Sequence, residues 1–317
     1  EPSAAAVSSI TATSAAITWT DNSAIEDNYV VEVATDGSDT FTAVSTTSAN
    51  ATSATTSTLS SNSQYQYRVK GTNAAGSSYY STSSLFYTLA AVAPKPTTTV
   101  HTATSLLITI DPGDNSTTTL FAVYNDTASQ YVAADGTLTS TPIYQTTTTW
   151  GVDFANTGLT PNTLYKYSVI ARNNDGIDSA TSPLSDGTYT FANVPTTVTG
   201  ASTAGSRSAT ISWSANGNPA GTVYTVDGLG NGLSSGNITA TSFQFTGLVA
   251  GGTYIFRVRA SSATGFASAY SSSVSVTITA DDGSPAPAGG DDAPEPPKPE
   301  DDPFDDPVDP DFMPTGL

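Results

Sequence analysis

Apolar and polar positions alternate in the same register in three separate parts of the chain. In each part a leucine is followed six residues later by a tyrosine, and the tyrosine opens a run in which alternate positions are aromatic, aromatic and valine. A period of two is typical of a β-strand with one buried face and one face in water. The leucine and tyrosine pairs are Leu59 and Tyr65, Leu159 and Tyr165, and Leu248 and Tyr254. The tyrosines lie 100 and 89 residues apart, which predicts one β-sandwich for each copy.

A second apolar anchor precedes each of these strands. Two copies have a short strand pattern that ends on a tryptophan, at Trp19 and at Trp213. The second copy has Leu106-Leu-Ile108-Thr-Ile110 in this place, so Ile110 fills the tryptophan position and that core must be packed differently. We therefore expect six structural core residues, which are Trp19, Tyr65, Ile110, Tyr165, Trp213 and Tyr254.

These motifs together resemble fibronectin type III domains. The leucine, the tyrosine and the continuation Tyr-x-aromatic-Arg-Val in the first and third copies are similar to the penultimate strand of that family. The resemblance implies that each of the three tyrosines is almost fully buried, with its hydroxyl bonded to the upstream backbone. It also implies that Trp19 and Trp213 pack against these tyrosines across the sandwich.

The fold class expected from these patterns is all-β, with three tandem sandwiches followed by an extended acidic, proline-rich tail. No long stretch shows the 3.6-residue period of an amphipathic helix. The expected boundaries are residues 1–90, 91–193, 194–280 and, for the tail, 281–317. Proline follows each closing strand within a few residues and ends pairing, because it lacks an N–H donor.

The joints between the sandwiches are short and partly apolar. Little free rotation is expected at such linkers, so we expect a semi-rigid row of three domains. Val92, Pro94 and Val194 should then be buried between consecutive domains.

The second domain is the longest between its two anchors, and the extra length predicts an insertion around residues 125–155. The insertion is rich in aromatic residues, among them Tyr131, Tyr144, Trp150 and Phe154. These rings form either a binding rim or extra strands that cover a core without its tryptophan. We favour the covering interpretation, because exposed aromatic rings are the less common outcome.

The last 37 residues differ sharply from the rest of the chain. They hold 12 of the 28 acidic residues and 10 of the 19 prolines, a composition that cannot bury a core and stays extended. This segment is either a solvated linker or a docking peptide. In the second case Phe304, Val308, Phe312 and Met313 are the assembly anchors that fill apolar grooves on a neighbouring subunit or domain.

Composition also excludes several kinds of chemistry. The chain has no cysteine and a single histidine, His101. It therefore lacks the residues needed for thiol nucleophiles, histidine-dependent triads and histidine metal sites. Nine basic residues against 28 acidic ones exclude a nucleic-acid footprint, and no apolar run is long enough to insert into a membrane. No cofactor is expected. Calcium at oxygen-rich turns such as Asp36-Gly-Ser-Asp39 is a weak alternative, because aspartate and glycine are common in turns.

Two classes of function remain open. The first is a non-catalytic structural protein, an extracellular or cell-surface filament, shaft or spacer subunit that self-associates through its tail. The second is an adhesin or a carbohydrate-binding accessory module of a secreted enzyme, with the aromatic insertion as the candidate glycan surface. The cysteine-free, Ser/Thr-rich composition favours a secreted or surface-displayed prokaryotic protein. Carboxylates scattered over turns, without a cleft, argue against catalysis.

Overall fold

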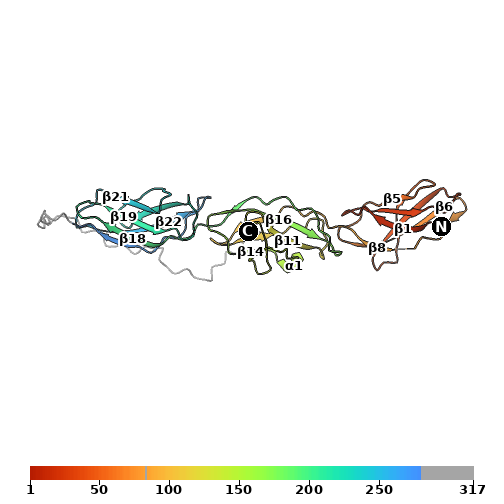
Figure 1. The fold of residues 1–317 in the computed structure, drawn as a ribbon, viewed down its shortest axis with the longest axis horizontal. Helices are drawn as coiled ribbons and strands as arrows, with labels where there is room; N and C mark the ends of the chain where they lie inside the picture. Colours follow the sequence, from red (N-terminus) through yellow and green to blue (C-terminus); the bar gives the residue numbers. More distant parts are fainter. Residues whose placement is uncertain (83, 280–317) are drawn as a thin grey trace, which may run out of the picture.

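The computed structural model describes residues 1–82 and 84–279, which form three β-sandwiches in a row (Figure 1). The expected all-β class is confirmed, because all the regular elements of these residues are strands except one four-residue helix, α1 (Thr147–Trp150). The predicted tail and its four anchors lie outside the described residues.

The first sandwich packs a three-stranded sheet against a five-stranded one. The first sheet has the order β1-β2-β5, from β1 (Ser3–Ser8), β2 (Ala16–Thr20) and β5 (Ser53–Thr55). The second sheet has the order β4-β3-β6, with two further strands paired to β6. Its members are β3 (Asn28–Thr35), β4 (Thr42–Thr46), β6 (Gln64–Asn73), β7 (Gly76–Ser77) and β8 (Ser84–Tyr87).

The second sandwich contains the insertion. Its first sheet has the order β14-β10-β9, from β9 (Thr97–Val100), β10 (Leu106–Thr109) and β14 (Phe154–Asn156). Its second sheet has the order β13-β12-β11-β16, from β11 (Leu120–Asn125), β12 (Gln130–Val132), β13 (Leu138–Thr139) and β16 (Tyr167–Arg172). A separate pair joins β15 (Leu164–Tyr165) to β17 (Thr188–Tyr189).

The third sandwich repeats the plan with two three-stranded sheets. One has the order β18-β19-β21, from β18 (Thr196–Ser202), β19 (Ala209–Ser214) and β21 (Ser242–Phe245). The other has the order β20-β22-β23, from β20 (Val223–Gly228), β22 (Thr253–Ser261) and β23 (Val274–Thr277). Strand pairs are antiparallel in all three sandwiches.

A tyrosine hydroxyl ties each long strand to the loop before it, as expected. The hydroxyl oxygen accepts a hydrogen bond from the backbone N–H of the residue that follows the repeated leucine. The pairs are Ser60 with Tyr65, Thr160 with Tyr165 and Val249 with Tyr254, at 2.9, 2.9 and 3.0 Å. Tyr65 and Tyr165 are buried, whereas Tyr254 is only half-buried, so the expectation of nearly complete burial is wrong for the third copy.

Two glycines precede the third tyrosine. Gly251 and Gly252 stand where the other copies have an asparagine followed by a serine or threonine. A Cβ at Gly252 would lie 3.1 Å from the ring of Tyr254, so a larger residue there would require the ring to shift.

Each of the two repeated tryptophans packs against a different tyrosine from the one expected. Trp19 lies against Tyr29 with ring centroids 5.3 Å apart, and Trp213 lies against Tyr224 at 5.5 Å. The prediction that the corner tyrosines occupy this position is wrong. Tyr29 and Tyr224 come from β3 and β20, the strands that pair with the corner strands. The corner tyrosines remain members of the same apolar clusters.

The insertion of the second domain supplies the tryptophan that its anchor strand lacks. Trp150 is 6% exposed and stacks on Phe154 with ring centroids 4.5 Å apart. Its indole N–H donates to the carbonyl of Phe121 at 2.8 Å, so the buried polar atom is satisfied. Ile110 lies just beyond β10, half-buried at the margin of this core. Trp150 therefore serves the core and does not form a binding rim.

Serine hydroxyls complete the sheet after each long strand, which the apolar pattern did not predict. In the second domain Ser179, Ser182 and Ser185 are spaced by three residues, a spacing that suits an extended polyproline-like segment. Each side-chain oxygen accepts a hydrogen bond from a β16 amide at 2.9 to 3.1 Å. Ser81 and Ser271 make the same bond in the other domains.

Replacing Trp150 with alanine should destabilise the second domain by about 3 to 5 kcal/mol, because the change leaves a cavity and removes one of the two hydrogen bonds to the Phe121 carbonyl. Hydrogen exchange read by mass spectrometry across a denaturant series resolves the three domains. Val152→Ala is the matched control, since Val152 lies in the same insertion and is 84% exposed. Equal effects of the two changes would contradict the assignment of Trp150 to the core.

Candidate functional site

Two asparagines at equivalent positions connect the three domains. Asn62 and Asn162 each stand three residues after the repeated leucine, in the turn before a corner tyrosine. Both have left-handed backbone, with φ of 44° and 46°, which asparagine tolerates better than most residues. This conformation points each side chain out of its own domain and toward the next one.

At the first joint both ends of the Asn62 amide are bonded across the domain boundary. Its Nδ2 donates to the hydroxyl of Thr119 at 2.9 Å, and its Oδ1 accepts from the backbone N–H of Asn174 at 2.8 Å. Asn62 is 2% exposed, and Thr119 is fully buried. A buried amide needs partners for both of its polar atoms, and only a fixed position of the second domain provides them.

The second joint repeats this arrangement. Nδ2 of Asn162 donates to the hydroxyl of Thr222 at 3.0 Å, and Oδ1 accepts from the backbone N–H of Ala263 at 2.7 Å. Thr119 and Thr222 stand in equivalent places, two residues before the aromatic residue at the start of β11 or β20. We call these four-atom contacts the asparagine bridges, of Asn62 and of Asn162.

Each receiving domain also holds the linker through an asparagine of its own. Asn115 accepts from the amide of Ala91 at 2.8 Å and donates to the Ala91 carbonyl at 2.9 Å. Asn218 makes the same pair of bonds with the backbone of Asn193, at 2.7 and 2.8 Å. In the first joint Asn173 adds a bond from its amide to the Thr88 carbonyl at 3.1 Å.

The apolar linker residues behave differently from the prediction. Val92 is 49% exposed, Pro94 is exposed and Val194 is half-buried, so they do not fill the joints. The buried linker residues are alanines and prolines. Ala90 and Ala93 belong to the core of the second domain and Ala192 to that of the third, and Pro96 and Pro195 are buried as well. At the second joint the rings of Phe191 and Phe266 also meet across the domain boundary, with centroids 6.1 Å apart.

Removing one asparagine bridge should leave one backbone N–H of the following domain without its hydrogen-bond acceptor. Asn62→Ala should accelerate hydrogen exchange of the Asn174 amide and leave the Ala263 amide unchanged, and Asn162→Ala should do the reverse. Asn174 and Ala263 are exposed, so the loss of the hydrogen bond corresponds to about 0.5 to 1.5 kcal/mol, or roughly a two- to 13-fold rate increase. NMR exchange rates of the two amides provide the measurement, and each variant is the control for the other. Acceleration of both amides by either change would contradict two independent bridges.

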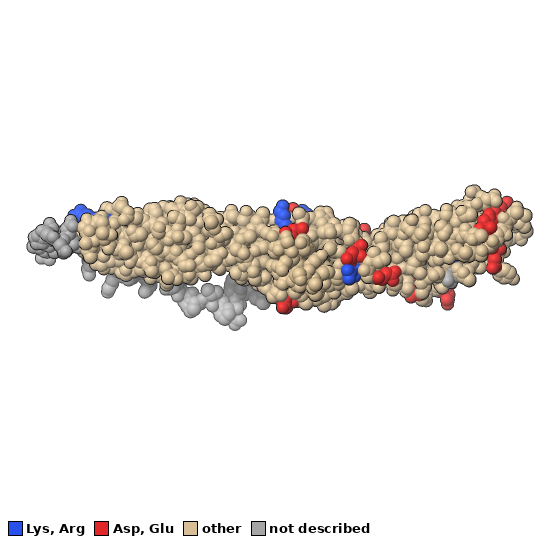
Figure 2. Space-filling view, viewed as in Figure 1, with Lys and Arg blue, Asp and Glu red and all other residues tan. Residues whose placement is uncertain are grey.

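A second group of contacts lies on the outer face of the β3–β6 sheet. The guanidinium of Arg68 lies 3.8 Å from the ring centroids of both Phe41 and Tyr80 and donates to Glu32 at 2.6 and 2.8 Å. Lys70 lies 3.1 Å from the same carboxylate. Figure 2 shows that charged residues are few on the visible face of the molecule and stand in small groups.

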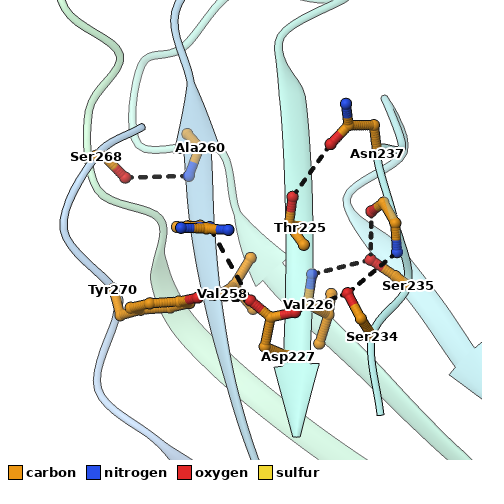
Figure 3. Close-up of polar contacts among 12 residues, drawn as sticks. Thr225, Val226, Asp227, Ser234, Ser235, Asn237, Val258, Ala260, Ser268 and Tyr270 are labelled. Carbon is orange, nitrogen blue, oxygen red and sulfur yellow. Dashed lines mark hydrogen bonds and ion pairs between the residues drawn. The ribbon is translucent and has the colours of Figure 1, made fainter. Parts of the chain in front are cut away.

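The third domain has a similar cluster (Figure 3). Tyr270 donates to the carboxylate of Asp227 at 2.5 Å, and Ser234 donates to it at 2.7 Å. The guanidinium of Arg257 lies 3.7 Å from the Tyr270 ring centroid, and that of Arg259 lies 4.0 Å from Asp227. The strand registers pair Glu32 with Arg68 and, equivalently, Asp227 with Arg257.

Two opposing effects act on the pKa of Glu32. Burial raises the pKa, whereas hydrogen bonds from Arg68, Lys70 and Tyr80 lower it, and the net result lies below the ordinary value of 4.5. A carboxyl group with a depressed folded-state pKa stabilises the fold above its unfolded pKa. That contribution is lost as the pH falls through the folded-state value.

Glu32→Gln should therefore lower the melting temperature of the first domain at neutral pH, and the difference from the native chain should shrink below about pH 4.5. Melting curves followed by circular dichroism between about pH 3 and pH 7 test this. Asp39→Asn changes an exposed carboxylate of the same domain and should not shift the melting temperature at neutral pH. A difference that stays constant down to the lowest pH would show that the charge of Glu32 is not responsible.

The structure gives no support to chemistry at the candidate turns. Among residues 1–82 and 84–279, no group of three or more His, Cys, Asp or Glu side chains is placed to hold a metal ion. His101, the one histidine, is exposed. No helix within the described part of the chain is long and apolar enough to cross a membrane. The anchors Phe304, Val308, Phe312 and Met313 lie outside the described residues, so docking of the tail stays a prediction.

Three end-to-end sandwiches, each with a corner tyrosine, define a tandem β-sandwich protein. Residues 1–86 and 193–277 match the family described as fibronectin type III domain. The chain belongs to this family. The second domain, with Ile110 at the tryptophan position and its tryptophan supplied from the insertion, lies outside both matched ranges.

A curated relative and two solved structures are similar to the chain. Exoglucanase B of Cellulomonas fimi is 29% identical over 279 residues, which are 84% of this chain and 24% of that protein. The chain thus spans about a quarter of its length. Chicken CNTN1 domains FN1–FN3 are 18% identical and cover 88% of this chain and 98% of that one, with a TM-score of 0.30. A two-domain fibronectin type III segment of chicken tenascin is 13% identical. The match covers 59% of this chain and 97% of that one, with a TM-score of 0.42.

Proposed function

We propose that the three domains form a non-catalytic, rigid spacer of a secreted protein, which holds the modules at its two ends at a fixed separation and rotation. The observation that carries this proposal is that both joints use the same asparagine bridge. Two independent joints of one design fix the orientation of three domains. A linker that only connected the modules would need neither bridge.

The similarity to a region of Exoglucanase B supports an accessory role, since that region is 24% of the enzyme's length. The name of that enzyme denotes action on a glucan polymer. Similarity to such an enzyme also supports an extracellular location for this chain. The spacer would then keep a flanking module at a constant distance from a surface or from a second module. Adhesion and filament formation draw no comparable support from the joints.

Self-association through Phe304, Val308, Phe312 and Met313 belongs to this proposal only as a finer alternative, argued from sequence. Analytical ultracentrifugation of the full chain, with Phe304→Ser and Phe312→Ser as variants, decides it. A monomer at all concentrations would leave the spacer function intact and remove the filament.

Paired spin labels test the spacer directly, because the chain has no cysteine of its own. Labels at exposed positions 39 and 134 span the first joint, and labels at 134 and 272 span the second. The native chain should give one narrow distance distribution for each pair. Asn62→Ala should broaden only the first distribution and Asn162→Ala only the second.

The control is Asn237→Ala, an exposed asparagine within the third domain, which should broaden neither distribution. Broad distributions in the native chain at either joint would overturn the proposed spacer.

A further inference from the structure

The second domain has a hollow of about 360 Å³ on the outer face of its β11–β16 sheet. Its walls include Tyr124, Asp126, Tyr131, Ser168, Ile170 and Thr181. Both tyrosines are half-exposed and come from the paired strands β11 and β12. This hollow lies away from the two joints and from the buried Trp150, and the spacer function does not use it.

The hollow occupies the place that a charged cluster fills in the other two domains. The strand register puts Tyr124 opposite Ser168, where the first domain has Glu32 opposite Arg68 and the third has Asp227 opposite Arg257. Small Ser168 replaces a long guanidinium side chain, so the face opens.

A third position shows the same change. Thr181 immediately precedes Ser182, whose hydroxyl binds the Val169 amide. Tyr80 and Tyr270 precede the equivalent serines of the first and third domains. In those domains the tyrosine ring covers arginine side chains, whereas Thr181 is exposed and covers nothing comparable. The second domain therefore has neither the acid and arginine pair nor the covering ring.

The groups that line the hollow suit an uncharged, hydroxyl-rich ligand. The rings of Tyr124 and Tyr131 meet edge to face, 4.9 Å between centroids and 64° between planes, which leaves aromatic surface for apolar C–H groups. Thr181, Ser129 and Ser140 are exposed and offer hydroxyls, and Asp126, which accepts from buried Ser168 at 2.8 Å, offers carboxylate oxygen. None of the lining residues is basic, so an anionic ligand would meet a carboxylate without a counter-charge.

We propose that this hollow is a binding site for a neutral glycan chain. A sugar ring combines an apolar face, which stacks on tyrosine, with hydroxyls that bond to serine, threonine and aspartate. The volume is near the lower end of the usual range for ligand pockets, about 300 to 1,000 Å³, so one or two sugar rings fit. The open shape lets the rest of a polymer continue past the protein on both sides.

The test is an NMR titration of the full chain, labelled with ¹⁵N, with three neutral probes: cellohexaose, mannohexaose and chitohexaose. At least one probe should cause saturable shifts confined to the residues of the hollow. Tyr124→Ala should weaken the association constant by about tenfold, which corresponds to 1.4 kcal/mol. Tyr80→Ala, on the equivalent face of the first domain, should leave it unchanged.

A second variant keeps the proposal testable if Tyr124→Ala unfolds the domain. Ser168→Arg introduces the arginine that stands at this position in the other two domains, and Asp126 would be its ion-pair partner. The arginine side chain should block the hollow and abolish the shifts. The proposal is overturned if no probe gives saturable shifts, or if binding persists unchanged in both variants. It is equally overturned if the same residues shift with protein concentration alone, because a second copy of the chain would then fill the hollow.

Discussion

The arrangement of the three domains depends on one side-chain amide at each joint, buried at the first joint and half-buried at the second. An amide removed from water needs a donor and an acceptor, and the partners of Asn62 and Asn162 belong to the following domain. Rotation or bending at a joint would separate those partners, and at the first joint it would leave a buried amide unpaired. The free energy cost of unpaired polar groups therefore favours one orientation, and the hydrophobic effect, which has no direction, could not do so.

The third domain shows what is specific to the joints. Its corner has the same leucine, the same tyrosine and the same left-handed turn, but Gly251 takes the place of the asparagine. The tyrosine hydroxyl bond forms there as in the other copies, so the asparagine is not needed to build the corner. The asparagines serve the contact between domains, and each of the two described joints has one.

Local patterns predicted the fold well because the information is local. The leucine and tyrosine spacing specifies both a half-buried strand and the hydroxyl bond that anchors it. The joints and the partner rings of Trp19 and Trp213 depend on residues more distant in the sequence, and asparagine in a turn is too common to mark a bridge. Two signals could have been found: asparagine at positions 62 and 162 with glycine at 251, and serine at every third residue from 179 to 185. The sequence favoured a covering role for the aromatic rings of the insertion, and Trp150 confirms it. Its partners Phe154 and Phe121 were not predicted, because an insertion has no counterpart in the other copies.

Residual dipolar couplings of the backbone amides test most directly whether two bridges make three domains into one body. In a weakly aligned sample of the full chain, couplings from residues 1–82, 97–191 and 196–279 should fit a single alignment tensor, with the domains oriented as in Figure 1. Separate tensors of different magnitude for the three domains would mean that they move independently, and would contradict the role given to Asn62 and Asn162.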